Sequence, residues 1–167
     1  MAVIATLVVG ADGSTSKGDR SSGVTSRIDR EKFLARRRLA DCIFIGGKTA
    51  RVEPYHRTPV PVVVVSRSMI NTLADNRLAH WWNLSPTEGL KKAKAKFGPN
   101  VLVEAGSSVV LELLDAHLIN SLELSVTKIT GGENPIDINM LLGYFQKVEK
   151  IEIEGTTFYS AQDPKFH

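Results

Sequence analysis

The stretch Val101-Leu-Val-Glu-Ala-Gly-Ser-Ser-Val-Val110 joins an apolar segment to a helix-like one, and it is the best indicator of the fold. The apolar residues end at a carboxylate, Glu104, and Gly106 opens the helical pattern two residues later. Glycine lets the backbone approach a ligand closely, and the first amide groups of a helix favour anions. The stretch therefore predicts a strand, a phosphate-compatible turn and a helix, with an acid beside the turn. An ordinary strand–turn–helix connection is the alternative.

Strand-like and helix-like segments alternate along the rest of the 167 residues. Continuous apolar runs separated by helices indicate a mainly parallel sheet that is covered on both faces. The last two strands alternate apolar and polar residues, which predicts an antiparallel edge joined through Gly155. Strands are expected at 3–9, 42–45, 60–66, 79–82, 101–104, 121–127, 148–154 and 156–160, and helices at 27–39, 48–52, 86–97 and 107–114.

Two segments near the N-terminus lead to specific expectations. The polar segment 10–23 is expected to be a long loop, and loops of this length are usually functional or disordered. Ser26 is a good N-cap for the helix that follows it. On that helix Ile28, Ala35 and Leu39 lie along one face, which is the pattern of a core-facing stripe.

The composition is that of an ordinary soluble globular protein. Hydrophobic residues make up 43% of the chain, and no run approaches the roughly 20 apolar residues of a membrane span. The N-terminal stretch lacks the basic start of a signal peptide and is interpreted as a strand. The single cysteine, Cys42, lies in an apolar run, and a buried thiol suits a reducing compartment. We therefore expect a cytoplasmic protein of one domain, residues 1–167.

The charge pattern favours a small anionic ligand over a polymer. The net charge is only +3, and the basic clusters at 36–38 and 91–96 contain no interleaved aromatic residues. The second cluster is interpreted as the solvated face of a helix. Neither nucleic acid nor a membrane is expected as a partner.

Several familiar site motifs are missing. The segment Gly46-Gly-Lys-Thr49 lacks the upstream glycine of a phosphate-binding P-loop, because that position is Cys42. No Gly-x-Gly-x-x-Gly follows the first strand, and no Gly-x-Ser-x-Gly is present. The four histidines are scattered without metal-ligand spacing, so no metal is expected.

Polar segments nevertheless follow four of the expected strands. In open α/β sheets, ligands bind beyond the carboxyl ends of the strands. Together the four segments predict a phosphorylated cofactor at that edge. They begin at Gly10, Gly46, Ser66 and Glu104.

Short motifs also keep a fixed order along the chain. They are Gly10-Ala-Asp-Gly13, Val24-Thr-Ser26, Arg37, Ile43-Phe-Ile-Gly-Gly-Lys-Thr49, Val62-Val-Val-Val-Ser66 and Val103-Glu-Ala-Gly-Ser107. In this order they resemble the reductase domain of riboflavin biosynthesis, within the dihydrofolate-reductase-like superfamily. The resemblance runs from the first strand to about Gly132.

The resemblance implies a dihydrofolate-reductase-like α/β fold, NADPH as cofactor and a homodimer. The implied reaction reduces the ribosyl group of 5-amino-6-(5-phosphoribosylamino)uracil, or of its diaminopyrimidinone analogue, to a ribityl chain. Substrate contacts are implied for Ser21, Arg37 and Glu104, and no catalytic acid or base is identified. Cofactor contacts are implied for Val9, Thr49, Glu53, Ser66, Gly106, Ser107 and Ser108. A zinc deaminase motif is absent from the sequence, so a separate deaminase chain is expected.

Several positions depart from the family pattern, and three of them lie in the first 23 residues. Thr6, Gly10 and Gly23 stand where the family commonly has a lysine, a serine and an aromatic residue. These departures keep two alternatives open. One is a dihydrofolate reductase or another pterin or carbonyl reductase, and the other is a non-catalytic NADP-binding module. The choice between NADPH and NADH also stays open.

Overall fold

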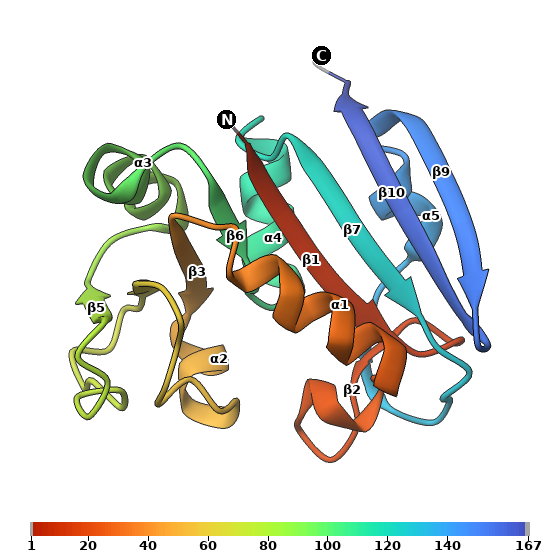
Figure 1. Cartoon of the computed structure of the whole chain (residues 1–167), viewed down its shortest axis with the longest axis horizontal. Coiled ribbons are helices and arrows are strands. Elements are labelled where there is room, and N and C mark those ends of the chain that lie inside the picture. Colours follow the sequence, from red (N-terminus) through yellow and green to blue (C-terminus); the bar gives the residue numbers. More distant parts are fainter. Residues whose placement is uncertain (1, 166–167) are drawn as a thin grey trace.

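The computed structural model describes residues 2–165 and is organised around one eight-stranded sheet (Figure 1). In spatial order its strands are β5 (Ala79–Trp82), β4 (Val62–Val65), β3 (Cys42–Gly46), β6 (Val101–Val103), β1 (Val3–Val9), β7 (Ser121–Val126), β10 (Thr156–Pro164) and β9 (Phe145–Ile153). The strands from β5 to β7 are parallel, whereas β10 and β9 are antiparallel. This arrangement confirms the predicted parallel sheet with an antiparallel C-terminal edge.

Helices cover both faces of the sheet (Figure 1). On one face lie α3 (Pro86–Phe97), α4 (Ser107–Asp115) and α5 (Ile138–Leu142), whose buried side chains join the larger hydrophobic core. On the other face lie α1 (Arg27–Arg37), α2 (Gly47–Val52) and the segments 53–61 and 66–78, which flank β4. Within residues 2–165, no helix has the length and apolar character that a bilayer crossing needs.

The central strands supply side chains to both cores. In β3, Phe44 joins the larger core while Ile43 and Ile45 join the smaller one, and all three side chains are fully buried. Successive residues of a strand point to opposite faces, so a strand buried on both sides consists of apolar residues throughout. Burial of each such side chain stabilises the fold by about 1.5–3 kcal/mol.

Helix α1 begins as predicted but packs differently. The Ser26 hydroxyl accepts a hydrogen bond from the Asp29 amide at 3.2 Å, which confirms the N-cap. The predicted core-facing stripe is wrong, because Ala35 is exposed and Leu39 lies beyond the helix with 83% of its surface exposed. The buried residues of α1 are Asp29 and Arg37. The apolar pattern was a wrong guide because the side chains that α1 turns toward the sheet are polar, and they lie over a cleft.

The segment 10–23 is not the structureless loop that was expected. Strand β2 (Ser14–Ser16) pairs antiparallel with β8 (Glu133–Pro135), and η1 (Ser21–Gly23) is a 3-10 turn. The pairing joins Ser16 to Glu133, more than a hundred residues later in the chain. Nothing in the local sequence of such a short polar strand shows where its partner lies, so the pairing was missed.

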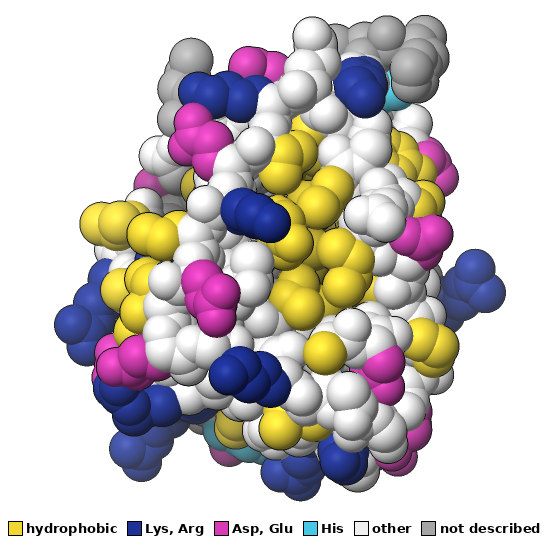
Figure 2. Space-filling view, turned by 90° about the vertical axis from the view of Figure 1, so that its right-hand side faces the viewer, with side chains coloured by type: hydrophobic (Ala, Val, Ile, Leu, Met, Phe, Trp, Pro, Cys, Tyr) yellow, Lys and Arg dark blue, Asp and Glu magenta, His cyan; other side chains and the backbone are white. Residues whose placement is uncertain are grey.

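The β9–β10 hairpin confirms the predicted C-terminal pair. Glu154 and Gly155 form its turn with φ values of 51° and 84°, which suits the two left-handed positions of a tight hairpin. Figure 2 looks at the β9 side of the molecule and shows hydrophobic side chains gathered there among charged ones. Met140, Val148 and Ile151 are exposed hydrophobic residues of α5 and β9.

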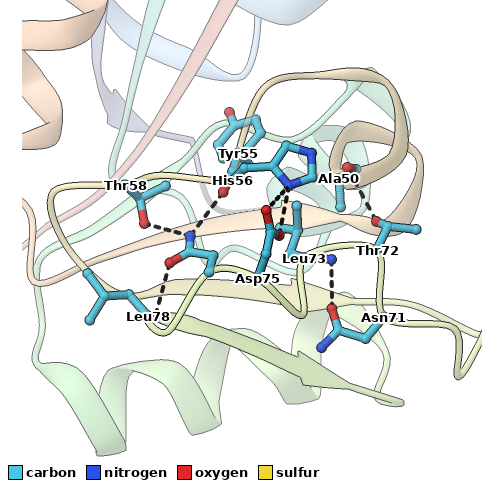
Figure 3. A network of polar contacts seen from close by, with 10 residues as sticks. Ala50, Tyr55, His56, Thr58, Asn71, Thr72, Leu73, Asp75 and Leu78 are labelled. Atoms are coloured by element: carbon cyan, nitrogen blue, oxygen red, sulfur yellow. Dashed lines mark hydrogen bonds and ion pairs between the residues drawn. The ribbon is translucent and has the colours of Figure 1, made fainter.

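A polar network joins the segments 53–61 and 66–78 on the face of the smaller core (Figure 3). The side-chain amide of Asn76 donates to the Tyr55 carbonyl at 2.9 Å and to the Thr58 hydroxyl at 3.1 Å. His56 Nδ1 lies 2.8 Å from a carboxylate oxygen of Asp75. Because Asn76 is buried and fully bonded, it fixes the backbone that carries the Tyr55 side chain.

Candidate active-site cleft

A cleft of about 580 Å³ opens at the carboxyl ends of β1, β3 and β6. Its walls come from α1, from α2 with the residues that follow it, and from the first turn of α4. The segment 15–22 forms one rim. The carboxyl edge of a parallel sheet is where open α/β folds bind ligands, and the sequence predicted the site at this edge.

Two of the predicted substrate residues bond to each other at the base of the cleft. Arg37 Nε lies 3.2 Å and 3.1 Å from the two carboxylate oxygens of Glu104, and an Nη lies 2.9 Å from one of them. Only 10% of the Arg37 side chain and 1% of the Glu104 side chain are exposed. The pair joins α1 to the residue that follows β6 through a buried ion pair.

Tyr55 completes this cluster, and sequence reasoning did not single it out. Its hydroxyl donates to Glu104 at 2.7 Å. The Arg37 guanidinium lies over two aromatic rings, 4.5 Å from the Phe33 centroid and 4.9 Å from the Tyr55 centroid. The only sequence signal for Tyr55 is its place directly after Glu53-Pro54, and tyrosine there has no distinctive spacing to the other motifs.

Burial and pairing shift the pKa values of these groups. Burial raises the pKa of the Glu104 carboxyl, and the hydrogen bonds from Arg37 and Tyr55 oppose that rise. Burial alone would lower the pKa of Arg37, but the hydrogen bond and charge of Glu104 outweigh it and raise the pKa. Burial also raises the pKa of Tyr55 well above its ordinary value. Tyr55 therefore stays a hydrogen-bond donor at neutral pH.

Two further predicted residues also meet in the cleft. The Ser21 amide donates to the Glu53 carboxylate at 2.8 Å. Ser21 belongs to η1 and Glu53 follows α2, so this bond connects the rim of the cleft to its α2 wall. The Glu53 side chain is thereby positioned by the rim as well as by the end of α2, which Glu53 follows.

Two helix starts face the cleft. Thr49 lies in the first turn of α2, and Ser107 and Ser108 lie in the first turn of α4, which Gly106 precedes. No side chain of the described residues caps either first turn. A Cβ at Gly106 would meet no described atom within 4 Å, so the backbone there is open to an incoming group. These features suit an anion such as a pyrophosphate.

Val9 and Ser66 lie outside the residues that line the cleft. The Val9 side chain is fully buried in the core, and its carbonyl accepts a hydrogen bond from the Thr127 amide at 2.9 Å. The Ser66 hydroxyl accepts from the Ser68 amide at 3.1 Å and lies beside Gly47 at the start of α2. Ser66 is thus close to one helix start without lining the cavity.

A family model described as the RibD C-terminal domain matches residues 1–138. The chain belongs to the RibD C-terminal domain family. This is the reductase family of riboflavin biosynthesis, and the match confirms the resemblance that the ordered motifs indicated. No curated protein matches the sequence.

Solved structures share the fold of this RibD C-terminal family member at low sequence identity. RibD of Acinetobacter baumannii is 14% identical with a TM-score of 0.75, and the match covers 99% of this chain and 58% of that one. A diaminohydroxyphosphoribosylaminopyrimidine deaminase/5-amino-6-(5-phosphoribosylamino)uracil reductase from Thermotoga maritima is 16% identical with a TM-score of 0.67, covering 98% and 56%. A pyrimidine reductase-like protein from Corynebacterium diphtheriae is 16% identical with a TM-score of 0.71, covering 99% and 92%. The chain spans less than two thirds of the first two relatives.

One departure from the RibD C-terminal family pattern has a local structural cause. A Cβ at Gly23 would lie 2.2 Å from the Lys17 carbonyl oxygen and 2.6 Å from the Lys17 Cβ. Since backbone cannot move aside cheaply, the folded segment 14–23 leaves no room for an aromatic side chain at this position. At Gly23, next to the rim of the cleft, close backbone packing therefore takes the place of the aromatic side chain that the family commonly has.

Cys42, the single cysteine of the sequence, is fully buried in β3. Burial raises the pKa of the Cys42 thiol to about 12, so the thiol stays protonated at neutral pH. Within residues 2–165, no cluster of three or more histidine, cysteine, aspartate or glutamate side chains is arranged to hold a metal ion.

Proposed function

We propose that the chain is an NADPH-dependent reductase that converts the ribosyl group of 5-amino-6-(5-phosphoribosylamino)uracil, or of its diaminopyrimidinone analogue, to a ribityl chain. The observation that carries the proposal is the cleft, where the Arg37–Glu104 pair and two open helix starts face one cavity. Membership of the RibD C-terminal family supports a reductase. The nature of the substrate and the preference for NADPH are inferred from the family.

The residues around α2 and α4 fit a dinucleotide cofactor. In our proposal the amide groups of Gly106, Ser107 and Ser108 bind the pyrophosphate, and Thr49 donates from the first turn of α2. Ser66 and Arg67, which follow β4, recognise the adenosine end. Val9 contributes only by shaping the end of β1, since its side chain is buried. When bound, the nicotinamide supplies a hydride, and the protein positions the groups around it.

The base of the cleft is the proposed substrate side. Glu104 and Arg37 form a compensated pair there, so they present fixed polar groups without a large local charge. Ser21, a proposed substrate contact, and Glu53, a proposed cofactor contact, are joined by their hydrogen bond at the rim of the cleft. The residues on this side bind and orient the substrate. The hydrogen bond from the Tyr55 hydroxyl keeps Glu104 in place.

A direct test is the oxidation of NADPH in the presence of each phosphoribosylaminopyrimidine, with NADH as the matched cofactor control. We expect turnover of one of the two pyrimidines, with NADPH preferred. An Arg67→Gln variant should reduce the preference for NADPH over NADH, because it weakens the binding of NADPH and leaves the binding of NADH unchanged. The absence of both NADPH binding and turnover would contradict the proposal.

The same assay separates the two alternatives. Turnover of dihydrofolate that methotrexate inhibits would make the chain a folate reductase. Tight NADPH binding without reduction of any pyrimidine or pterin would make it a binding module. Thr6, one of the departures that leave these alternatives open, lines the cleft, and the assay decides between them.

The assembly and pathway partners follow from the family and belong to the same proposal. We propose that the chain acts as a single cytoplasmic reductase domain, that it forms a homodimer, and that a separate chain supplies the deaminase activity. The dimer surface proposed is the β9 side, where Met140, Val148 and Ile151 are exposed. Size-exclusion chromatography with light scattering measures the mass of the assembly.

A further inference from the structure

Helix α1 carries more than one arginine toward the cleft, and their bonding differs. Arg30, Phe33, Arg36 and Arg37 all line the cavity, and their spacing of three, six and seven residues places them on one face of the helix. Arg37 is hydrogen-bonded to Glu104 and contacts the rings of Phe33 and Tyr55. Its charge is already compensated, which makes it a poor ligand for a dianion.

Arg30 and Arg36, the other two arginines of α1 that line the cleft, keep hydrogen-bond donors for a ligand. Within residues 2–165, the Arg30 side chain is exposed and makes no hydrogen bond or ion pair. Arg36 has a single ion pair, a long one of 3.8 Å to Glu123. That carboxylate is also engaged by the Ser160 hydroxyl at 2.9 Å. Both guanidinium groups therefore keep free donors at the mouth of the cleft.

The acidic residues of the cleft do not cancel these two charges. Glu104 is paired with Arg37, and Glu53 accepts from the Ser21 amide. Asp29 is buried and accepts from the Thr25 hydroxyl at 2.6 Å. Asp19, on the rim, is the remaining acid among the lining residues, whereas Arg20 and Lys48 line the cleft as well. The cleft lining therefore carries more cations than its acids compensate, and two of these cations, Arg30 and Arg36, lie on α1.

We propose that Arg30 and Arg36 form the site for the phosphate monoester of the substrate, while Arg37 is a positioning residue. The guanidinium fork matches phosphate oxygens through two parallel hydrogen bonds, and two forks on one helix face can hold a dianion. This inference rests on the proposed function for the identity of the substrate. It places the phosphate contact on two neighbours of Arg37, which the family resemblance implies only as a substrate residue.

The test measures binding of ribose 5-phosphate to the full chain by calorimetry, with ribose as the unphosphorylated comparison. We expect Arg30→Gln and Arg36→Gln each to weaken ribose 5-phosphate binding by about tenfold or more, since each removes a charge-assisted interaction. Arg38→Gln is the matched control, because Arg38 ends the same helix outside the cleft lining and should change binding less than about twofold. Circular dichroism checks that every variant is folded.

NADPH binding distinguishes the substrate phosphate from a cofactor phosphate. The proposal expects both variants to bind NADPH as the wild type does. Weaker NADPH binding with unchanged ribose 5-phosphate binding would overturn it, as would wild-type binding of ribose 5-phosphate no tighter than of ribose. Loss of ribose 5-phosphate binding only in Arg37→Gln, folded and with Arg30 and Arg36 intact, would overturn the proposal and assign the phosphate contact to Arg37.

The outcome is separable from that of the proposed reductase activity. Ribose 5-phosphate binding that depends on Arg30 and Arg36, without turnover of either pyrimidine, would support the phosphate site and contradict the reductase. Equal turnover of phosphorylated and dephosphorylated pyrimidine would support the reductase and overturn the phosphate site.

Discussion

At the scale of single residues, the main feature is the buried charged pair at the base of the cleft, Arg37 and Glu104. A buried ion pair is expensive to break from one side, because the partner is left uncompensated. Glu104→Ala would leave Arg37 buried without its carboxylate, and we expect a loss of about 3–5 kcal/mol in the free energy of unfolding. The double variant Arg37→Met/Glu104→Leu should recover most of that loss, since both charges are gone. Urea unfolding of the two variants measures the difference, and equal destabilisation would show that the pair is not coupled.

Tyr55 tests the same cluster from its other side. Tyr55→Phe removes only the hydroxyl that donates to Glu104, and we expect a loss of about 1.5–3 kcal/mol because the acceptor is charged. Tyr159→Phe is the control, since within residues 2–165 the Tyr159 hydroxyl makes no hydrogen bond. Its free energy of unfolding should change by less than about 0.5 kcal/mol. Similar effects of the two substitutions would argue against the role of the Tyr55 hydroxyl.

At the scale of the element, α3 shows packing overriding helix propensity. Alanine is favoured over glycine in a helix by about 1 kcal/mol, so propensity alone predicts that Gly89→Ala stabilises the protein. A Cβ at this position would lie 2.3 Å from a methyl carbon of Val65, a short and stiff side chain. We therefore expect Gly89→Ala to lower the melting temperature. Lys94→Ala, at an exposed position of α3, should leave it nearly unchanged, and stabilisation by Gly89→Ala would contradict the close packing.

The turn after β1 depends on pH through Asp12. Hydrogen bonds from the Ser14 hydroxyl, the Gly131 amide and the Ser14 amide lower the pKa of the Asp12 carboxyl from 3.8 to about 2. A carboxyl with a lower pKa in the folded chain contributes stability above its ordinary pKa. That contribution is lost as the pH falls from about 4 toward 2.

We expect the amide of Gly131 to exchange faster with solvent as the pH falls through this range, after correction for the intrinsic pH dependence of exchange. Asp12→Asn should remove this extra pH dependence, because its side chain does not titrate. Carbon-detected NMR of the Asp12 carboxyl gives the pKa directly. A value near 3.8 would show that the turn does not hold the ionised form.

At the scale of the whole molecule, the proposed homodimer depends on the β9 side. Val148 is 41% exposed in this strand, and a lysine there would have to be desolvated in a dimer. We expect Val148→Lys to shift the mass measured by light scattering from dimer toward monomer. Ile70→Lys is the control, because Ile70 is 75% exposed in the segment between β4 and β5, the strands at the opposite end of the sheet. A dimeric Val148→Lys would exclude this surface.

The sequence was a good guide to elements whose pattern is local and apolar. The runs in β3, β4 and β6 were identified because strands buried on both faces consist almost wholly of hydrophobic residues. It was a poor guide to α1, whose inward face carries Asp29 and Arg37. It was poor for β2 as well, since the partner of that strand lies far along the chain.

The amino-acid sequence by itself determined the α/β class, the order of the elements and the edge of the sheet where ligands are expected. Those features depend on periodicity and on motif order, which are readable residue by residue. Only the tertiary structure decided that Arg37 is paired with Glu104, that Tyr55 joins them, and that Ser21 meets Glu53. These contacts join residues 32 to 67 positions apart. Their geometry follows from how the helices settle on the sheet, and no local pattern encodes that.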